Sequence, residues 1–168
     1  MKLKKLVYSS VFLCIGMILP LLTSQIKEIG DSLLPMHIPV MLCGFIAGPW
    51  YGLAVGFILP FLRSAVFSMP PMYPNAVWMA FELATYGFMC GLLYNIRKKQ
   101  GLPYIYLCLI ASMLCGRIVW GIAKTLLLMG KSAFTLQAFW IGGFIDAIPG
   151  IILQLVLIPI IVKRVKKL

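Results

Sequence analysis

Long apolar runs alternate with short polar segments along the whole chain. A helix needs about 20 apolar residues to cross the hydrocarbon core of a bilayer. The run at 35–47 is shorter, and Pro35 and Pro39 remove backbone donors there, so we expect a short helix with an unwound outer end. The pattern predicts an all-α membrane protein, a single bundle of about six transmembrane helices forming one domain over residues 1–168. The predicted spans are 6–22, 35–47, 50–67, 76–96, 103–128 and 138–162.

Composition supports this class of protein. The chain is 62% hydrophobic and only 11% charged, which is far from the composition of a soluble domain. The net charge of +11 lies mostly in short clusters beside apolar runs, so we expect no nucleic-acid partner. The clusters are Lys2, Lys4 and Lys5; Arg97, Lys98 and Lys99; and Lys163, Arg164, Lys166 and Lys167.

The same clusters predict an orientation. With six spans, both termini and the connections at 48–49 and 97–100 share one side of the membrane. Every basic cluster then lies on that side, and the opposite connections hold only Lys27 and Lys131. Loops rich in Lys and Arg stay in the cytoplasm. We therefore expect a multi-pass protein of the cell membrane with both termini inside.

Metal-site and enzyme motifs are missing from the sequence. The five cysteines sit in apolar runs without a CxxC pair, and only His37 could join them as a metal ligand. GxSxG, HExxH and P-loop patterns are also missing. We expect no cofactor, no enzymatic activity and no ATPase in this chain.

Glycines recur at four-residue spacing, which lets helices approach closely. The series is Gly44, Gly48, Gly52 and Gly56, followed by Gly87 and Gly91. We expect these glycines to serve packing within the chain rather than dimerisation.

Five ionisable residues lie inside the spans, where charges are costly and usually paired or functional. At 1.5 Å per residue, their depths range from roughly 6 to 16 Å below the outer ends of the helices. A channel needs polar groups through the full depth, whereas a cup open to the outside needs them in the outer half. The five are Arg63, Glu82, Arg117, Lys124 and Asp146.

Helical spacing groups polar and aromatic residues into three stripes. We expect the stripes to converge on one cavity with tryptophan walls. They consist of Asn75, Trp78, Glu82 and Thr85; of Arg117, Trp120 and Lys124; and of Asp146, Gly150 and Gln154. The predicted substrate-binding residues are Asn75, Trp78, Glu82, Arg117, Trp120, Asp146, Arg63, Lys124 and His37.

Structural alternatives stay open for several of these residues. Glu82 can pair with Arg117 or Arg63 and hold helices together. Lys124 and Arg63 can reach the outer headgroups with their long side chains. Trp50 and Trp140, at span ends, fit the interfacial aromatic belt, and His37 can make a hydrogen bond at a helix start.

The stretch from Leu34 to Gly91 resembles the substrate-binding S components of energy-coupling factor (ECF) transporters. The resemblance rests on Met36-His37-Ile38-Pro39-Val40 and Gly48-Pro49-Trp50-Tyr51-Gly52, with Gly56 following. It implies capture of a vitamin or other micronutrient at the outer face. It also implies docking on a transmembrane coupling subunit driven by two ABC ATPases.

The resemblance further implies two lids, at 24–39 and 67–75. The family docks through an Ala-x-x-x-Ala-type motif on the first helix, and Ser10-x-x-x-Cys14 is the nearest match here. The HIPV stretch is similar to pantothenate-type S components, and three cations against two acids in the spans suit a carboxylate substrate.

The sequence thus favours the substrate-capture subunit of an ECF-type ABC importer. A self-sufficient secondary transporter is one alternative, and it predicts polar groups at the bilayer midplane or below. An intramembrane enzyme using Glu82 or Asp146 is another. A structural membrane subunit is the last, and it predicts that the polar stripes are ion pairs only.

Overall fold

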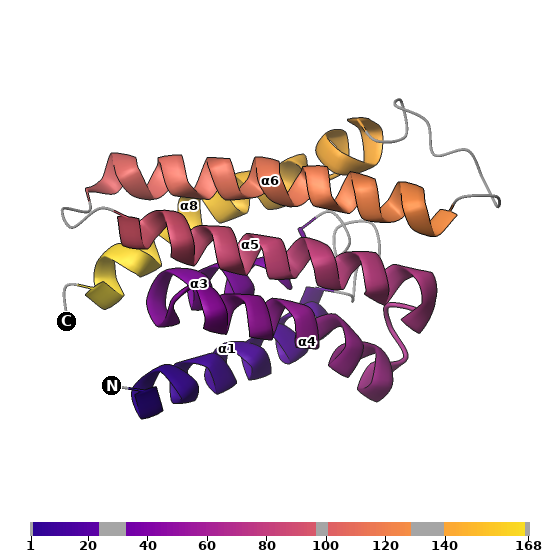
Figure 1. Ribbon diagram of the computed structural model, residues 1–168, viewed down its shortest axis with the longest axis horizontal. Helices are drawn as coiled ribbons and strands as arrows, with labels where there is room; N and C mark the ends of the chain where they lie inside the picture. The colour runs from indigo at the N-terminus through magenta and orange to yellow at the C-terminus, as the bar shows by residue number, and fades with distance from the viewer. Residues whose placement is uncertain (1, 24–32, 97–100, 129–139, 167–168) are drawn as a thin grey trace.

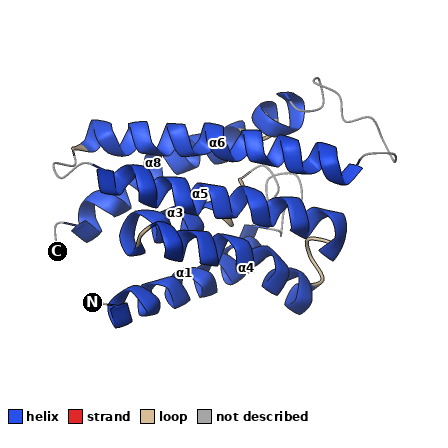
Figure 2. Cartoon of the chain, in the orientation of Figure 1, coloured by secondary structure: helices blue, strands red, loops and turns tan. Residues whose placement is uncertain are grey.

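Helices make up nearly all of the described structure. The computed structural model describes residues 2–23, 33–96, 101–128 and 140–166, and no strand occurs in these ranges (Figures 1 and 2). The expectation of an all-α membrane bundle is confirmed. The elements are α1 Lys2–Thr23, α3 His37–Ala47, α4 Pro49–Phe67, η1 Met72–Ala76, α5 Val77–Ile96, α6 Leu102–Leu128, η2 Ile141–Ile145 and α8 Ile148–Lys166.

Five of the helical stretches are long and apolar enough to cross a membrane. The exception is α3, which has 11 residues, ten of them buried. At 1.5 Å per residue it is about 16 Å long, roughly half of a hydrocarbon core of about 30 Å. The expected short second helix is confirmed, and residues 33–36 before it are not helical. The long spans are Lys2–Leu22, Pro49–Phe67, Met72–Ile96, Leu102–Leu128 and Ile141–Val165.

The last span is interrupted, whereas the sequence pattern predicted one continuous run over 138–162. The Asp146 N–H bonds the Ile141 carbonyl in a π-type turn, and Asp146 and Ala147 form a turn before α8 begins. Pro149 supplies the physical reason, because it has no N–H for the Ile145 carbonyl and its ring crowds that carbonyl. Residues 138–139 of the predicted span lie outside the described residues.

Backbone contact between α3, α4 and α5 forms the centre of the bundle. A Cβ atom on Gly44 or Gly52 would overlap the Gly87 carbonyl, and one on Gly56 would overlap the Leu83 carbonyl. The connection between α3 and α4 is a single residue, Gly48, whose φ of 110° is unfavourable for any residue with a side chain. The glycine series therefore serves packing within the chain, as expected.

The two ends of the bundle differ in character. At one end Gly48 lies close to the side chains of Lys5 and Asn95, and both chain termini lie at this end as well (Figure 1). Because this end carries the described basic clusters, we call it the basic end. The opposite end is formed by the C-terminal ends of α1, α4 and α6 and the N-terminal ends of α3 and α5.

Glycine 87 provides a direct test of the central packing. Gly87→Ala should lower the free energy of unfolding by about 2 kcal/mol, because the new methyl group meets the Gly52 backbone and overpacks the seam. Thermal unfolding in detergent measures the change. Gly101→Ala is the matched control, since its Cβ would meet only the Pro103 side chain at an ordinary 3.5 Å. Equal melting temperatures for the two variants would contradict the packing account.

Candidate functional site

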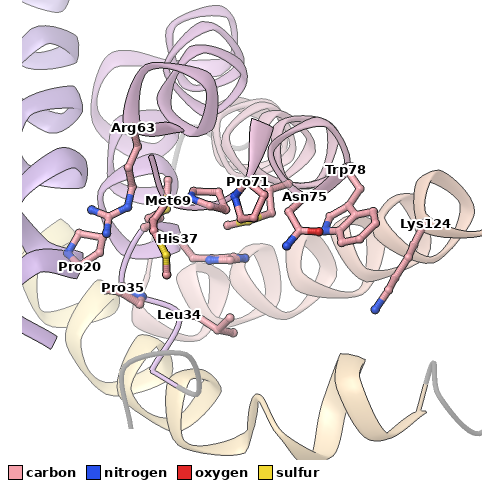
Figure 3. Close-up of a pocket in the computed structure, with 13 residues that line it drawn as sticks. Pro20, Leu34, Pro35, His37, Arg63, Met69, Pro71, Asn75, Trp78 and Lys124 are labelled. Atoms are coloured by element: carbon pink, nitrogen blue, oxygen red, sulfur yellow. The ribbon is translucent and has the colours of Figure 1, made fainter. Parts of the chain in front are cut away.

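A cavity of about 530 Å³ lies at the end of the bundle opposite the basic end. It is enclosed by residues from α1, α4, α5 and α6, by the segment that leads into α3, and by the connection after α4 (Figure 3). Its lining residues are Pro20, Leu34, Pro35, Met36, His37, Arg63, Met69, Pro70, Pro71, Asn75, Trp78, Met79 and Lys124.

Two cationic side chains line this cavity from different helices. Arg63 of α4 is only 7% exposed; its Nη1 donates to the Met17 carbonyl of α1 at 3.0 Å, and its guanidinium lies 5.6 Å from the Phe67 ring centroid. Lys124 of α6 is half-buried, with Nζ 5.3 Å from the Trp78 ring centroid. Both side chains line the cavity, which is the position that a substrate-binding role requires.

A buried ion pair lies beside the cavity and joins α5 to α6. Arg117 Nη1 donates to Glu82 Oε1 at 2.9 Å, and the two residues are only 5% and 2% exposed. Neither residue lines the cavity. The alternative in which Glu82 pairs with Arg117 is therefore what the structure shows. A carboxylate buried in a membrane is tolerable only with such a partner.

His37 lies between this ion pair and the cavity. It is 2% exposed, and its ring packs edge-on against Tyr86 with the centroids 5.1 Å apart. Its Nε2 is 3.4 Å from Glu82 Oε1, which is close enough for electrostatic attraction. The geometry does not make a hydrogen bond, and both ring nitrogens lack a hydrogen-bond partner among the described residues. Two unsatisfied nitrogens in a buried ring are unusual, because buried polar groups are normally hydrogen-bonded.

The predicted residues divide into three groups. Arg63, His37, Asn75, Trp78 and Lys124 line the cavity. The second group consists of Glu82 and Arg117, which pair beside it. The third group consists of Trp120 and Asp146.

Trp120 and Asp146 lie away from the cavity lining. The Trp120 ring packs where Gly142 and Gly143 of η2 leave room, with Lys124 Nζ 4.7 Å from its centroid. Asp146 is exposed, while Gly150 and Gln154 are buried. The expectation that Asp146, Gly150 and Gln154 share one inward face is wrong, because the turn at 146–147 breaks the helical register.

Sequence reasoning located the cavity too far toward the C-terminal half. The lining includes Pro20 of α1 and the segments at 34–37 and 69–71, all from the N-terminal half. Helical stripes could not reveal these segments because they lie at helix ends and in connections. The two predicted lids do include them, at 24–39 and 67–75, although 24–32 lie outside the described residues.

The comparisons with known proteins decide the family. The family model described as "ECF transporter, substrate-specific component" matches residues 4–162. The chain belongs to this family. Comparison with curated proteins and with solved structures gives no significant match.

As a substrate-specific component of an ECF transporter, the chain has a role in membrane transport. Its helices and its lipid-facing surface fit that role: large apolar side chains such as Ile118, Leu126 and Ile152 are more than half exposed. The family description does not name a substrate. The chemistry of the cavity is therefore the guide to what this S component binds.

The ion pair beside the cavity generates a testable prediction about stability. Glu82→Leu alone leaves Arg117 buried and unpaired, and should cost about 3 kcal/mol or more in free energy of unfolding. Arg117→Met alone should cost a similar amount. The double variant should lose less than either single variant, because no charge then remains in the apolar interior.

Thermal unfolding of the four proteins in detergent completes this double-mutant cycle. Additive losses in the double variant would show that Glu82 and Arg117 do not depend on each other, against the 2.9 Å contact.

Proposed function

We propose that this chain is the substrate-capture subunit of an ECF-type ABC importer and binds a small water-soluble vitamin or related micronutrient. The observation that carries the proposal is the cavity of about 530 Å³ at the end opposite the basic clusters. Small-molecule sites have volumes of about 300–1,000 Å³, with mostly apolar walls and a few polar groups that fix orientation. Family membership supports the same role.

The proposed orientation places the cavity on the outer face of the cell membrane. The described basic residues near the chain ends, including Lys2, Lys5 and Lys163, belong in the cytoplasm by the positive-inside rule. The cavity lies at the other end of the same helices. A substrate would therefore enter from outside.

The residues take two proposed roles. Arg63, His37, Asn75, Trp78 and Lys124 contact the substrate, because their side chains line the cavity. The remaining predicted residues support them. Glu82 and Arg117 hold α5 against α6, and the Trp120 ring packs against the Lys124 ammonium group. Asp146, exposed on the turn before α8, has no supporting observation as a binding residue.

The proposed partners are a transmembrane coupling subunit and two ABC ATPases, which would energise uptake that this chain cannot energise itself. The surface of α1 supports a docking role. Only 22% of the apolar stretch of α1 is buried inside the protein, against 33–50% of the corresponding stretches of the other long spans. The small residues Ser10 and Cys14 are both exposed there, one turn apart. Small residues at this spacing let another helix approach closely.

Ligand identification is the primary test of capture. The chain, expressed alone in rich medium and purified in detergent, should release one vitamin at near-equal stoichiometry, read by mass spectrometry. The same vitamin should raise the melting temperature. Pantothenate is the first compound to test, because the HIPV stretch resembles pantothenate-type S components. If a demonstrably folded sample releases nothing and no vitamin stabilises it, the chain is a structural subunit instead.

Two tryptophans offer a matched comparison. Trp78→Ala should weaken binding of the identified vitamin at least about tenfold, since Trp78 forms a cavity wall. Trp50→Ala should leave the affinity unchanged, because Trp50 is 71% exposed and packs on Phe88 away from the cavity. Isothermal titration measures both affinities. Equal effects of the two substitutions would place the binding site elsewhere.

Docking is tested separately from binding. Cys14→Trp should leave vitamin affinity intact but abolish uptake in vesicles that contain the coupling subunit and ATPases, because the large ring blocks close helix approach. Ile110→Trp on α6 is the control, since Ile110 is also exposed, at 47%, but lies on a different helix. Loss of uptake in Ile110→Trp alone would assign docking to α6.

A further inference from the structure

The cavity lining has a clear electrostatic bias. Among its described lining residues are two cations, Arg63 and Lys124, and no carboxylate. The acidic residue nearby, Glu82, lies outside the lining and is already paired with Arg117. Arg63, which has no carboxylate partner among the described residues, would repel a cationic substrate and attract an anion in a medium of low dielectric constant.

Arg63 is the cation best placed to hold an acid group. It is 7% exposed and has no acidic partner among the described residues. Of the five N–H donors of a guanidinium, one is donated to the Met17 carbonyl. The planar fork of the remaining donors matches the two oxygens of a carboxylate.

Lys124 is less suited to this role. It is only half-buried, and its Nζ lies over the rings of Trp78 and Trp120. Figure 3 shows Arg63 and Lys124 on opposite sides of the cavity. Lys124 therefore contributes positive potential at a distance from Arg63.

Two further polar side chains lie between the cations. Both ring nitrogens of the buried His37 lack a hydrogen-bond partner among the described residues, and Asn75 is half-buried in the lining. Figure 3 shows both side chains directed into the space between Arg63 and Lys124. The half-buried Asn75 amide, with both donor and acceptor atoms, is therefore suited to hydrogen-bond polar groups of a bound molecule.

We propose that the substrate is a small organic acid whose carboxylate is bound by Arg63 and whose body carries hydroxyl or amide groups that hydrogen-bond Asn75. The proposal rests on the capture function above and narrows it to one substrate class. Trp78 and the methionines at 36, 69 and 79 would cover the apolar part of such a molecule.

Matched acid and neutral compounds test the substrate class on the wild-type protein. The probes are pantothenate with pantothenol, nicotinate with nicotinamide, and biotin with biotinamide, together with thiamin as a cation. The true substrate should be an acid that binds about ten- to a hundredfold tighter than its neutral counterpart, the range expected for a hydrogen-bonded charge. Isothermal titration in detergent measures each dissociation constant, and mass spectrometry identifies any co-purified compound.

Substitutions then test the assignment to Arg63. Arg63→Gln should remove most of the preference for the acid over its neutral counterpart, because the charge that distinguishes them is gone. Lys124→Gln should weaken both members of the pair by a similar factor and so keep the preference. Arg63→Lys keeps a charge and a donor for the Met17 carbonyl, so it stays folded even if Arg63→Gln does not, and it should show an intermediate preference.

Each outcome has a distinct meaning. Tight binding of an uncharged or cationic vitamin, or a co-purified compound without a carboxylate, overturns the organic-acid proposal and leaves substrate capture standing. Loss of the acid preference in Lys124→Gln but not in the Arg63 variants overturns the assignment to Arg63. Failure of a folded wild-type protein to bind any probe or retain any compound overturns the capture function and this proposal together.

Discussion

The close approach of α3, α4 and α5 at their glycines is the constraint on which the rest of this structure depends. No side chain separates the helices where Gly44, Gly52 and Gly87 meet, so the position of α5 is fixed by backbone contact. The backbone carbonyl of Leu83 in α5 packs directly against Gly56 of α4. The adjacent residue Glu82 is then directed away from α4, toward His37 of α3 and Arg117 of α6. A backbone constraint thereby determines where the one buried acid of the described residues lies.

That position decides the charge of the cavity. A carboxylate in the interior of a membrane protein must be paired, and Arg117 supplies the partner from α6. Because the pair is internally neutral and lies outside the lining, the charged residues among the described lining are the two cations Arg63 and Lys124. If Glu82 faced the cavity instead, its negative charge would offset one of these two positive charges. The sign of the charge on the cavity lining therefore depends on helix packing as much as on amino-acid composition.

Sequence reasoning succeeded where a physical pattern is strong over many residues. Apolar runs located the long spans, and the short run at 35–47 predicted a short helix. Depth along the helices predicted that Arg63 and Lys124 lie near one end, and both line the cavity there. The prediction failed where a local break in the helix changes the register. Pro149 interrupts the last span in this way, and Asp146 in the resulting turn is exposed. Sequence reasoning also could not find the contact between Arg63 and the Met17 carbonyl, since a backbone acceptor leaves no trace in the side-chain pattern.

The half-length of α3 accounts for the existence of the cavity. This helix begins at His37 and ends only about 16 Å away at Ala47, beside Gly48 at the basic end. Its neighbour α4 has 19 residues and continues for about 28 Å, so space remains beyond the end of α3. The N-terminus of α3 points into that space, and the helix dipole places partial positive charge there. The same short helix that opens the cavity therefore reinforces the positive potential of Arg63 and Lys124 within it.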